Sequence, residues 1–331
     1  MLGYILKRCG AAVIVLFLVS VFTYVIFFAL SPDPALQICG KTCNPERIDQ
    51  IRDQLGLDQP LWKQYWEFFS GLFVGRDYGS GSQAIHCSAP CLGYSFQTNE
   101  SVMDMVVDRL PVTATVAVGA AVLWLLGGVM GGVISAFQRG KFWDKFFNAI
   151  ALGGISLPNY FVALLLQYIL VVQLQILPFP QAVPFSENPG RWFAAYLMPW
   201  MVLAFQYMAI YTRLTRTNVI DTLNQNFMRT ARAKGLKPSL VVGRHALRPA
   251  LTPVTTMFGM DFAALLGGAL ITETVFGLNG IGKLTSDSIT KNDQPVIMAV
   301  TLLAAAFVVI ANILVDIGYR YLDPRVRVKS S

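Results

Sequence analysis

The stretch 226–254 reads NFMRTARAKGLKPSLVVGRHALRPALTPV, and the rest of the sequence can be organised around it. It is basic, and it lies between two apolar runs, 193–212 and 250–272. Alanine and arginine favour a short helix over 227–234, and Gly235 is suited to end that helix in the left-handed conformation. A basic loop between two apolar runs of about 20 residues is typical of the cytoplasmic side of a multi-pass membrane protein.

The composition indicates the same class of protein. Hydrophobic residues make up 54% of the 331 residues and charged residues only 14%, whereas a soluble domain carries about 25% charged residues. Six apolar runs are long enough to cross a membrane, at 9–30, 112–137, 146–173, 193–212, 250–272 and 295–318. We therefore expect an all-α membrane protein with six transmembrane helices.

The distribution of lysine and arginine orients these helices. With the N-terminus inside, most of the 26 lysines and arginines fall in cytoplasmic segments, including the connection 139–145 and the loop 213–249. The external connection 174–192 holds only Arg191. The positive-inside rule then predicts that the N-terminus and the tail 319–331 are both cytoplasmic. The first run has no small-residue cleavage site, so we expect it to be retained as a span.

The predicted spans divide the chain into three parts before the tail. These are a first span in 1–30, an extracytoplasmic region in 31–111, and a transmembrane domain in 112–318 that contains the basic loop. Within the external region, the apolar stretch 66–75 is too short to cross a membrane. We expect it to form a helix on the membrane surface, with aromatic residues such as Trp62 at the interface.

Four of the five cysteines lie in the external region, as two C-x₃-C pairs. They are Cys39, Cys43, Cys87 and Cys91. Disulfides persist outside the cytoplasm, so we expect two of them here, and four cysteines allow three connectivities. His86 beside Cys87 leaves a zinc site as the alternative, which is disfavoured because the usual zinc spacing is C-x₂-C.

The stretch 276–285, FGLNGIGKLT, comes close to the G-x-x-x-x-G-K-[ST] pattern of a phosphate-binding loop. However, Leu284 stands where that pattern has Ser or Thr, no strand is predicted before it, and the topology places it outside, where there is no ATP. We instead expect a turn-rich re-entry between spans five and six. Its turn residues would be Gly277, Asn279, Gly280 and Gly282.

The sequence contains no arrangement of residues typical of catalysis. There are only two histidines, with no H-x-x-x-H motif, no Ser/His/Asp set and no paired carboxylates within a span. Asp261 is the one acidic residue well inside a predicted span, and we expect it to face the protein interior or a water-filled path. The amides of Asn159 and Gln206 would suit such a path, with hydrogen bonds between helices as their alternative role.

The loop 226–254 resembles the EAA loop of ABC importer permeases, and its form RTARAKGL…RHALRPALTPV is typical of the oligopeptide, dipeptide and nickel permease family. Aligned on Gly235, however, the first three places hold Arg229, Thr230 and Ala231 rather than E-A-A. Asn279 and Gly280 stand where the family usually has Pro-Gly, and the external cysteine pairs are an unexpected insertion. Other stretches that agree are MLGYILKR at 1–8, LGLDQPLWKQYWEFF at 55–69, RLPVTATVAV at 109–118, GISLPNYF at 154–161, ETVFGLNGIGKL at 273–284 and LDPRVR at 322–327.

The resemblance implies a type I ABC importer permease fold with a long external segment between helices 1 and 2. It implies a non-catalytic, multi-pass subunit in the lipid of the inner or plasma membrane, which moves peptides, above all oligopeptides, into the cytoplasm. An extracytoplasmic substrate-binding protein would deliver the peptide, and a second homologous permease subunit would complete the pathway. Two ATPase subunits would hold ATP and Mg, so the chain itself would carry no cofactor and no metal, and no nucleic acid would be a partner.

In this family the loop acts as a coupling helix against the ATPase. The resemblance places the coupling residues at Arg229, Thr230, Ala231, Arg232, Ala233, Lys234, Gly235 and Leu236. We further expect Asn279 and Lys283, in the external loop, to contact the docked binding protein.

Three other functions are alternatives. An importer of the same fold could carry dipeptides, nickel or haem. A secondary carrier would be a different class, but the sequence lacks the several buried charges and the inverted halves of such carriers. A membrane receptor or assembly factor would not transport at all, and co-purification of an ATPase would separate an importer from both.

Overall fold

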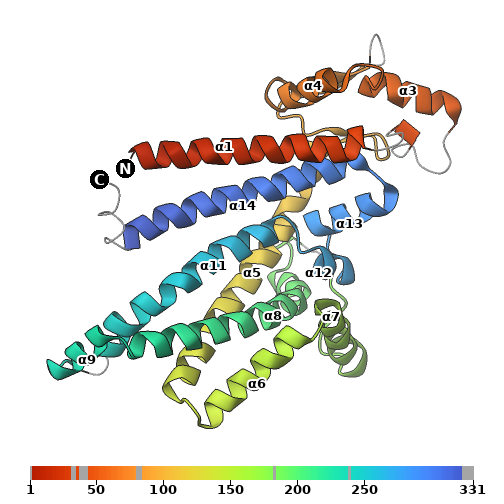
Figure 1. Cartoon of the computed structure of the whole chain (residues 1–331). Helices are drawn as coiled ribbons and strands as arrows, with labels where there is room; N and C mark the ends of the chain where they lie inside the picture. Colours follow the sequence, from red (N-terminus) through yellow and green to blue (C-terminus); the bar gives the residue numbers. More distant parts are fainter. Residues whose placement is uncertain are drawn as a thin grey trace. The chain divides into compact units, whose positions relative to one another are not determined.

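The computed structural model describes residues 2–30, 35–36, 44–79, 84–181, 184–237 and 240–322. Helices make up most of these residues (Figure 1). The chain divides into two units, each built from segments that are distant in sequence. Unit 1 comprises Met1–Thr113, Leu266–Leu270 and Asn279–Ile310, and unit 2 comprises Ala114–Leu265, Ile271–Leu278 and Ala311–Ser331.

Four helical segments of the described chain are long and apolar enough to cross a membrane. A fifth candidate is a helix pair with a sharp bend, so the count reaches five where the sequence predicted six. The four segments lie in α1 (Leu2–Tyr24) with the π-helix η1 (Val25–Ala29), α5 (Val102–Phe137), α8 (Pro189–Leu223) and α14 (Gln294–Leu322).

The bent pair shows that the predicted span 146–173 is broken into two helices. Helix α6 (Phe142–Ser156) is followed by α7 (Asn159–Gln167), which continues as the π-helix η3 (Tyr168–Gln173). Between α6 and α7 the direction of the chain bends by 104°. Leu157 and Pro158, between them, are extended, with ψ of 130° and 139°. Proline lacks an N–H and disfavours helical geometry in the residue before it, which ends α6.

The fifth predicted span, 250–272, is also interrupted. Helix α11 (Arg248–Leu266) stops before Gly268, whose φ is +118°, and the short helix α12 (Leu270–Val275) follows. The 19 residues of α11 include Pro253, several threonines and Asp261. Among the described residues, α11 is not one of the helices that are long and apolar enough to cross a membrane. The six-span count therefore stays a prediction.

The glycines of 276–285 have two different roles. Gly277 has φ of +65° and forms a turn, as expected. Gly282 lies instead inside α13 (Ile281–Lys291), where a Cβ atom would stand 2.5 Å from the backbone nitrogen of Leu270. Its predicted role in a turn is wrong: the absence of a side chain allows two backbone segments of unit 1 to pack in contact.

The part of unit 1 that was predicted to be extracytoplasmic contains two helices and two small antiparallel sheets. Helices α3 (Pro45–Leu55) and α4 (Leu61–Val74) precede a pair formed by β1 (Arg76–Tyr78) and β2 (Ile85–Cys87) and a pair formed by β3 (Tyr94–Ser95) and β4 (Glu100–Ser101). These elements enclose a small core of Ala35, Ile51, Leu55, Tyr78, Cys87, Cys91 and Phe96.

Helix α4 is the helix predicted around 66–75, and it begins earlier than expected. Its inner face packs on α1, where the ring of Tyr24 lies 5.8 Å from that of Phe68 and 5.5 Å from that of Tyr65. Its outer face leaves Trp62 and Trp66 exposed, by 73% and 62%. This amphipathic arrangement suits a membrane interface, and the position of α4 on the membrane stays a prediction.

In unit 2, α5 and α8 pack closely because α5 carries glycines along the contact. A Cβ atom on Gly119 would lie 2.1 Å from the ring of Trp200, and one on Gly132 would lie 2.6 Å from Thr215. The indole nitrogen of Trp200 donates to the carbonyl of Thr115 over 2.9 Å. Small residues that allow close backbone approach are typical of contacts between membrane helices.

Candidate functional site

The basic loop contains the short helix α9 (Asn226–Ala233), as predicted. Its end has the two hydrogen bonds of a Schellman motif: the amide of Gly235 donates to the carbonyl of Arg232 over 3.0 Å, and that of Leu236 donates to Ala231 over 3.4 Å. Gly235 has φ of +69°, which confirms the predicted left-handed conformation. The sequence therefore fixes where α9 ends.

One face of α9 is buried against the chain itself. Met228 is fully buried and Ala231 is 7% exposed. They pack with Val241 and Ala246 of the π-helix η4 (Val241–Leu247) and with Leu223 at the end of α8. Ala231, which the resemblance placed among the coupling residues, is thus largely covered by the chain itself.

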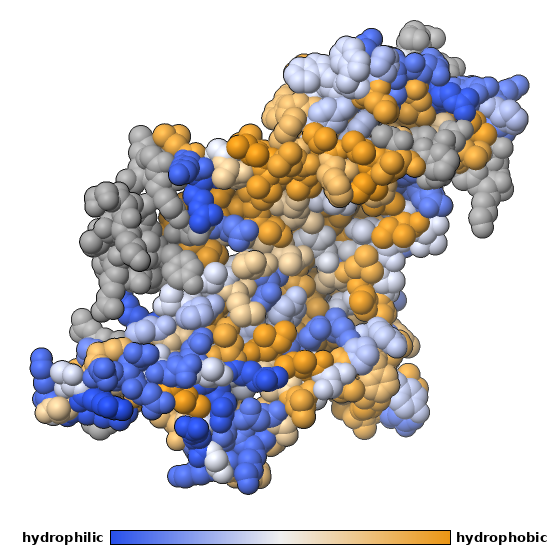
Figure 2. Space-filling view, in the orientation of Figure 1, coloured by the Kyte–Doolittle hydropathy of each residue, from blue (hydrophilic) through white to orange (hydrophobic). Residues whose placement is uncertain are grey.

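The other face of α9 is open and positively charged. Figure 2 shows hydrophilic residues gathered over this helix. Such a surface suits a partner with acidic residues, because complementary charges speed and orient association. The exposed members of the predicted coupling set are Arg229, Thr230, Arg232, Ala233, Lys234, Gly235 and Leu236.

An ion pair near this loop, with a buried carboxylate and a partly exposed guanidinium, is not evident from the sequence. Arg216 of α8 donates from Nε to Oδ1 of Asp144 over 2.7 Å and from Nη2 to Oδ2 over 2.9 Å. The two residues are 72 positions apart, so sequence spacing does not pair them. The available signal was that Asp144 is the one acidic residue in the otherwise basic connection 139–145.

The three predicted path residues do not form one cluster. The hydroxyl of Tyr211 donates to Asp261 Oδ2 over 2.8 Å, and the amide of Asn159 donates to Thr272 Oγ1 over 3.2 Å. Gln206 is half-buried on α8. Among the described residues, no hydrogen bond joins Asn159, Gln206 and Asp261 to one another. Their role in a path stays a prediction.

The predicted binding-protein contacts lie close together in unit 1. The ammonium of Lys283, in α13, donates over 3.1 Å to Oδ1 of Asn279, which precedes the helix by two residues. Asn279 is exposed, and Leu284 beside Lys283 is buried. The element before this stretch is the helix α12 rather than a strand, so the arrangement differs from a phosphate-binding loop.

Cys87 and Cys91 form a disulfide in the small core that also contains Ile51 and Tyr78. A disulfide sulfur does not act as a thiolate ligand, which contradicts the alternative of a zinc site at this pair. The side chain of His86 instead contacts Asp77, with 2.6 Å between Nδ1 and Oδ1. Cys39 and Cys43, expected to form the second disulfide, lie outside the described residues.

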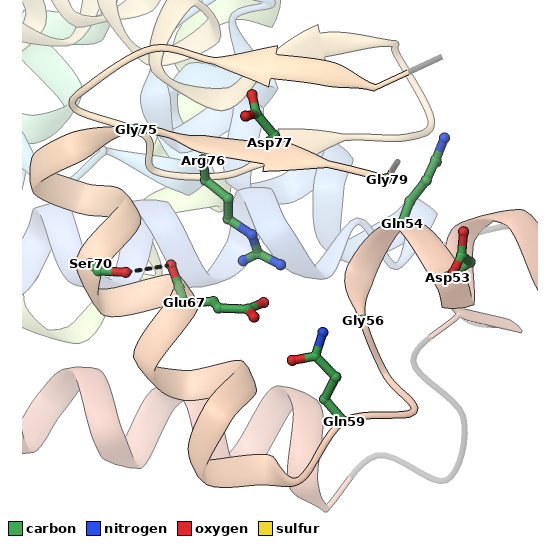
Figure 3. Close-up of a pocket in the computed structure, with 10 residues that line it drawn as sticks. All are labelled: Asp53, Gln54, Gly56, Gln59, Glu67, Ser70, Gly75, Arg76, Asp77 and Gly79. Carbon is green, nitrogen blue, oxygen red and sulfur yellow. Dashed lines mark hydrogen bonds between the residues drawn. The ribbon is translucent and has the colours of Figure 1, made fainter. Parts of the chain in front are cut away.

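A cavity of about 410 Å³ lies in unit 1, between α3, α4 and β1. In Figure 3 the guanidinium of Arg76 points into this space, toward the carboxylate of Glu67 and the amide of Gln59. Nη2 of Arg76 also lies 3.5 Å from the carbonyl of Leu55. This cavity is not evident from the sequence, because its polar groups come from three separate elements.

The chain matches two family models. Residues 1–117 match the N-terminal part of the membrane component of binding-protein-dependent transport systems, and residues 128–328 match the inner membrane component itself. A putative peptide transport system permease protein of Brucella abortus (strain 2308) is 34% identical over 327 residues, covering 99% of both chains. The glutathione transport system permease protein GsiC of Escherichia coli (strain K12) is 34% identical over 329 residues, covering 99% of this chain and 100% of that one.

Proposed function

This chain belongs to the family of binding-protein-dependent transport system inner membrane components, and on that premise we propose that it is a permease subunit of an ATP-driven importer of peptides. Relatives over the full length of the chain are named as peptide and glutathione permeases, which supports a peptide-like substrate. Oligopeptides remain the substrate that the sequence favours. Dipeptides, nickel and haem are the alternatives of the same fold.

The observation that carries the proposal is the architecture of α9. The helix is held to the chain by Met228 and Ala231, ends at a positive-φ glycine, and exposes Arg229, Arg232 and Lys234. An exposed cationic helix anchored by its opposite face is suited to transmit force from a docked partner. In this proposal the partner is an ATPase subunit, whose closure on ATP displaces α9.

The remaining partners follow from the same premise. A second homologous permease subunit completes the pathway, a binding protein delivers substrate outside, and two ATPase subunits hold ATP and Mg. The chain is not itself an enzyme. We place it in the cell membrane with six spans and with both termini in the cytoplasm, in agreement with the basic residues of 139–145 and of α9.

The test is uptake by the complete complex reconstituted in vesicles. Labelled peptides of several lengths, glutathione and nickel are supplied with the binding protein outside and ATP inside. We expect ATP-dependent accumulation of peptides and a stimulation of ATP hydrolysis by the loaded binding protein. Accumulation of nickel alone, or accumulation that persists without ATP and follows an ion gradient, would sink the proposal.

A further inference from the structure

We propose that Asp144 is a positioning residue for transport. It locks α5, α6 and α8 together near the basic loop, so that a displacement of α9 is passed on to the helices of unit 2. The inference deepens the proposed function and rests on it. None of the sequence motifs assigns a role to Asp144.

The Asp144 carboxylate accepts hydrogen bonds from four separate segments of unit 2. Arg216 of α8 binds both oxygens, at 2.7 and 2.9 Å. The backbone amide of Gly140, in the turn before α6, donates over 2.8 Å. The hydroxyl of Ser135 on α5 and the amide of Asn148 on α6 also donate to it, the second over 2.7 Å. One side chain thus links α5, the turn after it, α6 and α8.

The burial of this network makes it sensitive to the loss of any one partner. The side chain of Asp144 is 7% exposed and that of Arg216 is 25% exposed. A buried charge is tolerated only when its partners satisfy it, and removing one partner leaves the other unpaired at a high cost. The bidentate geometry of Arg216 also fixes orientation, because both oxygens must be met by one planar group.

A continuous stripe of side chains leads from this network to α9. Arg216, Val219, Ile220 and Leu223 follow the i, i+3, i+4, i+7 spacing, so they lie on one face of α8. Seven residues span about 10 Å along a helix. Leu223, at the end of the stripe, packs in two clusters, one with Met228 of α9 and one with α5 and α11.

The consequence is mechanical. A shift of α9 moves Leu223, and through it the end of α8. If α8 could slide past α5 and α6, the shift would be lost at their contact. The Asp144 bonds remove that freedom, since packed helices move between discrete arrangements as bodies rather than deform continuously. Asp144 therefore contributes to the efficiency with which ATP hydrolysis is converted into transport.

A purely structural ion pair would have a different signature. Its loss would lower the amount of assembled complex, and with it uptake and ATP hydrolysis in the same proportion. A positioning residue changes their ratio. The number of peptides imported per ATP hydrolysed, measured on one sample of assembled complex, separates the two roles.

The experiment uses the complete reconstituted complex with Asp144→Asn and Arg216→Lys. Matched controls are Asp221→Asn and Arg213→Lys, the same changes at exposed positions of α8. We expect both Asp144→Asn and Arg216→Lys to lower the peptide-to-ATP ratio by about twofold to thirtyfold, the range of mutations along coupling networks. Stimulation of ATP hydrolysis by the loaded binding protein should persist, and both controls should keep the wild-type ratio.

An unchanged ratio in both variants would overturn the inference, whether uptake and hydrolysis fall together or neither falls. If Asp144→Asn does not assemble, Ser135→Ala removes a single donor and should lower the ratio in the same direction by a smaller factor, and an unchanged ratio there would equally overturn the inference. The wild-type complex separates the two claims. Absence of peptide uptake by the wild type contradicts the proposed function, whereas normal wild-type uptake with an unchanged ratio in the variants contradicts only the role of Asp144.

Discussion

The hydroxyl of Tyr211 donates a hydrogen bond to Asp261 across 2.8 Å, which joins α8 to α11 within unit 2. Tyr211 is fully buried, and so is Trp124, whose ring lies 6.1 Å from that of Tyr211 and stacks on Tyr207 at 4.7 Å. Asp261, the one acidic residue inside a predicted span, thus lies beside an aromatic cluster, and its carboxylate accepts a hydrogen bond from the hydroxyl of Tyr211.

We expect Tyr211→Phe to destabilise unit 2 by about 0.5–2 kcal/mol, because hydrogen bonds between membrane helices contribute in this range. Thermal unfolding of the purified chain in detergent measures the change. Tyr160→Phe, the same change at a side chain that is 53% exposed, is the control and should leave the melting temperature unaltered. Equal melting temperatures for both variants would show that the bond to Asp261 contributes nothing.

Gly235 is constrained by its backbone and not by its neighbours, since no atom lies within 4 Å of a Cβ placed on it. Gly235→Ala should therefore cost about 1–2 kcal/mol through its φ of +69° alone. We expect ATP-dependent uptake to fall with it. Gly235→Asn should retain most of the uptake, because asparagine tolerates this conformation.

Gly243 provides the matched control for Gly235. It also has open space around a Cβ position, but its φ is outside the left-handed range. Gly243→Ala should leave uptake close to the wild type. A loss as large as that of Gly235→Ala would mean that side-chain bulk in the loop, and not the end of α9, is what matters.

Ala231 and Ala233 lie two residues apart on α9 and should respond differently to the same change. Ala231→Leu overpacks the buried face and should destabilise the chain by about 1–3 kcal/mol. Ala233→Leu adds bulk to the exposed face and should leave the melting temperature unchanged, because leucine favours helix, while it weakens co-purification of the ATPase. Normal co-purification with Ala233→Leu would argue against docking on this face.

Cys39, Cys43, Cys87 and Cys91 should resist alkylation in the denatured chain until a reductant is added. Cys9 is a free thiol, and we expect it alone to be labelled before reduction, if Cys39 and Cys43 are paired as predicted. Mass spectrometry of the peptide that contains Cys87 and Cys91 should show the intact bond. Alkylation of that peptide without reduction would contradict the disulfide.

Asp293 should make the stability of unit 1 dependent on pH. Burial raises the pKa of its carboxyl above the usual range, and the hydrogen bond from Ser95 opposes this. The folded chain then holds the proton to a higher pH than the unfolded chain. The corresponding stability is fully present below the usual pKa of about 3.9 and is lost as pH rises through the folded value.

Asp293→Asn keeps a neutral acceptor for Ser95 and should remove this dependence. Melting temperatures of the variant and the wild type should agree near pH 4, and the variant should become the more stable of the two as the pH rises toward about 7. A constant difference across this range would show that Asp293 does not titrate there.

The features that could be predicted from the sequence are those that depend on residues close together in the chain. The helix over 227–234 and its end at Gly235 depend on neighbouring residues, and both were found as expected. A proline inside an apolar run indicates a kink, so the sequence marked Pro158 as a break in 146–173. The 104° size of the bend was not predicted, because hydropathy carries no information about direction and 146–173 holds no charged residue. The Asp144–Arg216 pair depends on how α6 and α8 pack, and no pattern of neighbouring residues indicates that packing.

The bend between α6 and α7 has a consequence for biosynthesis. Membrane insertion responds to hydrophobicity over a window of about 19 residues, so a nascent chain presents 146–173 as one apolar segment. The hydrogen bond that holds the start of α7, from Asn159 to Thr272, joins residues 113 positions apart. The ribosome must add that entire length before this hydrogen bond can form, so the contact that holds the start of α7 against Thr272 is made only after the bent segment has been synthesised.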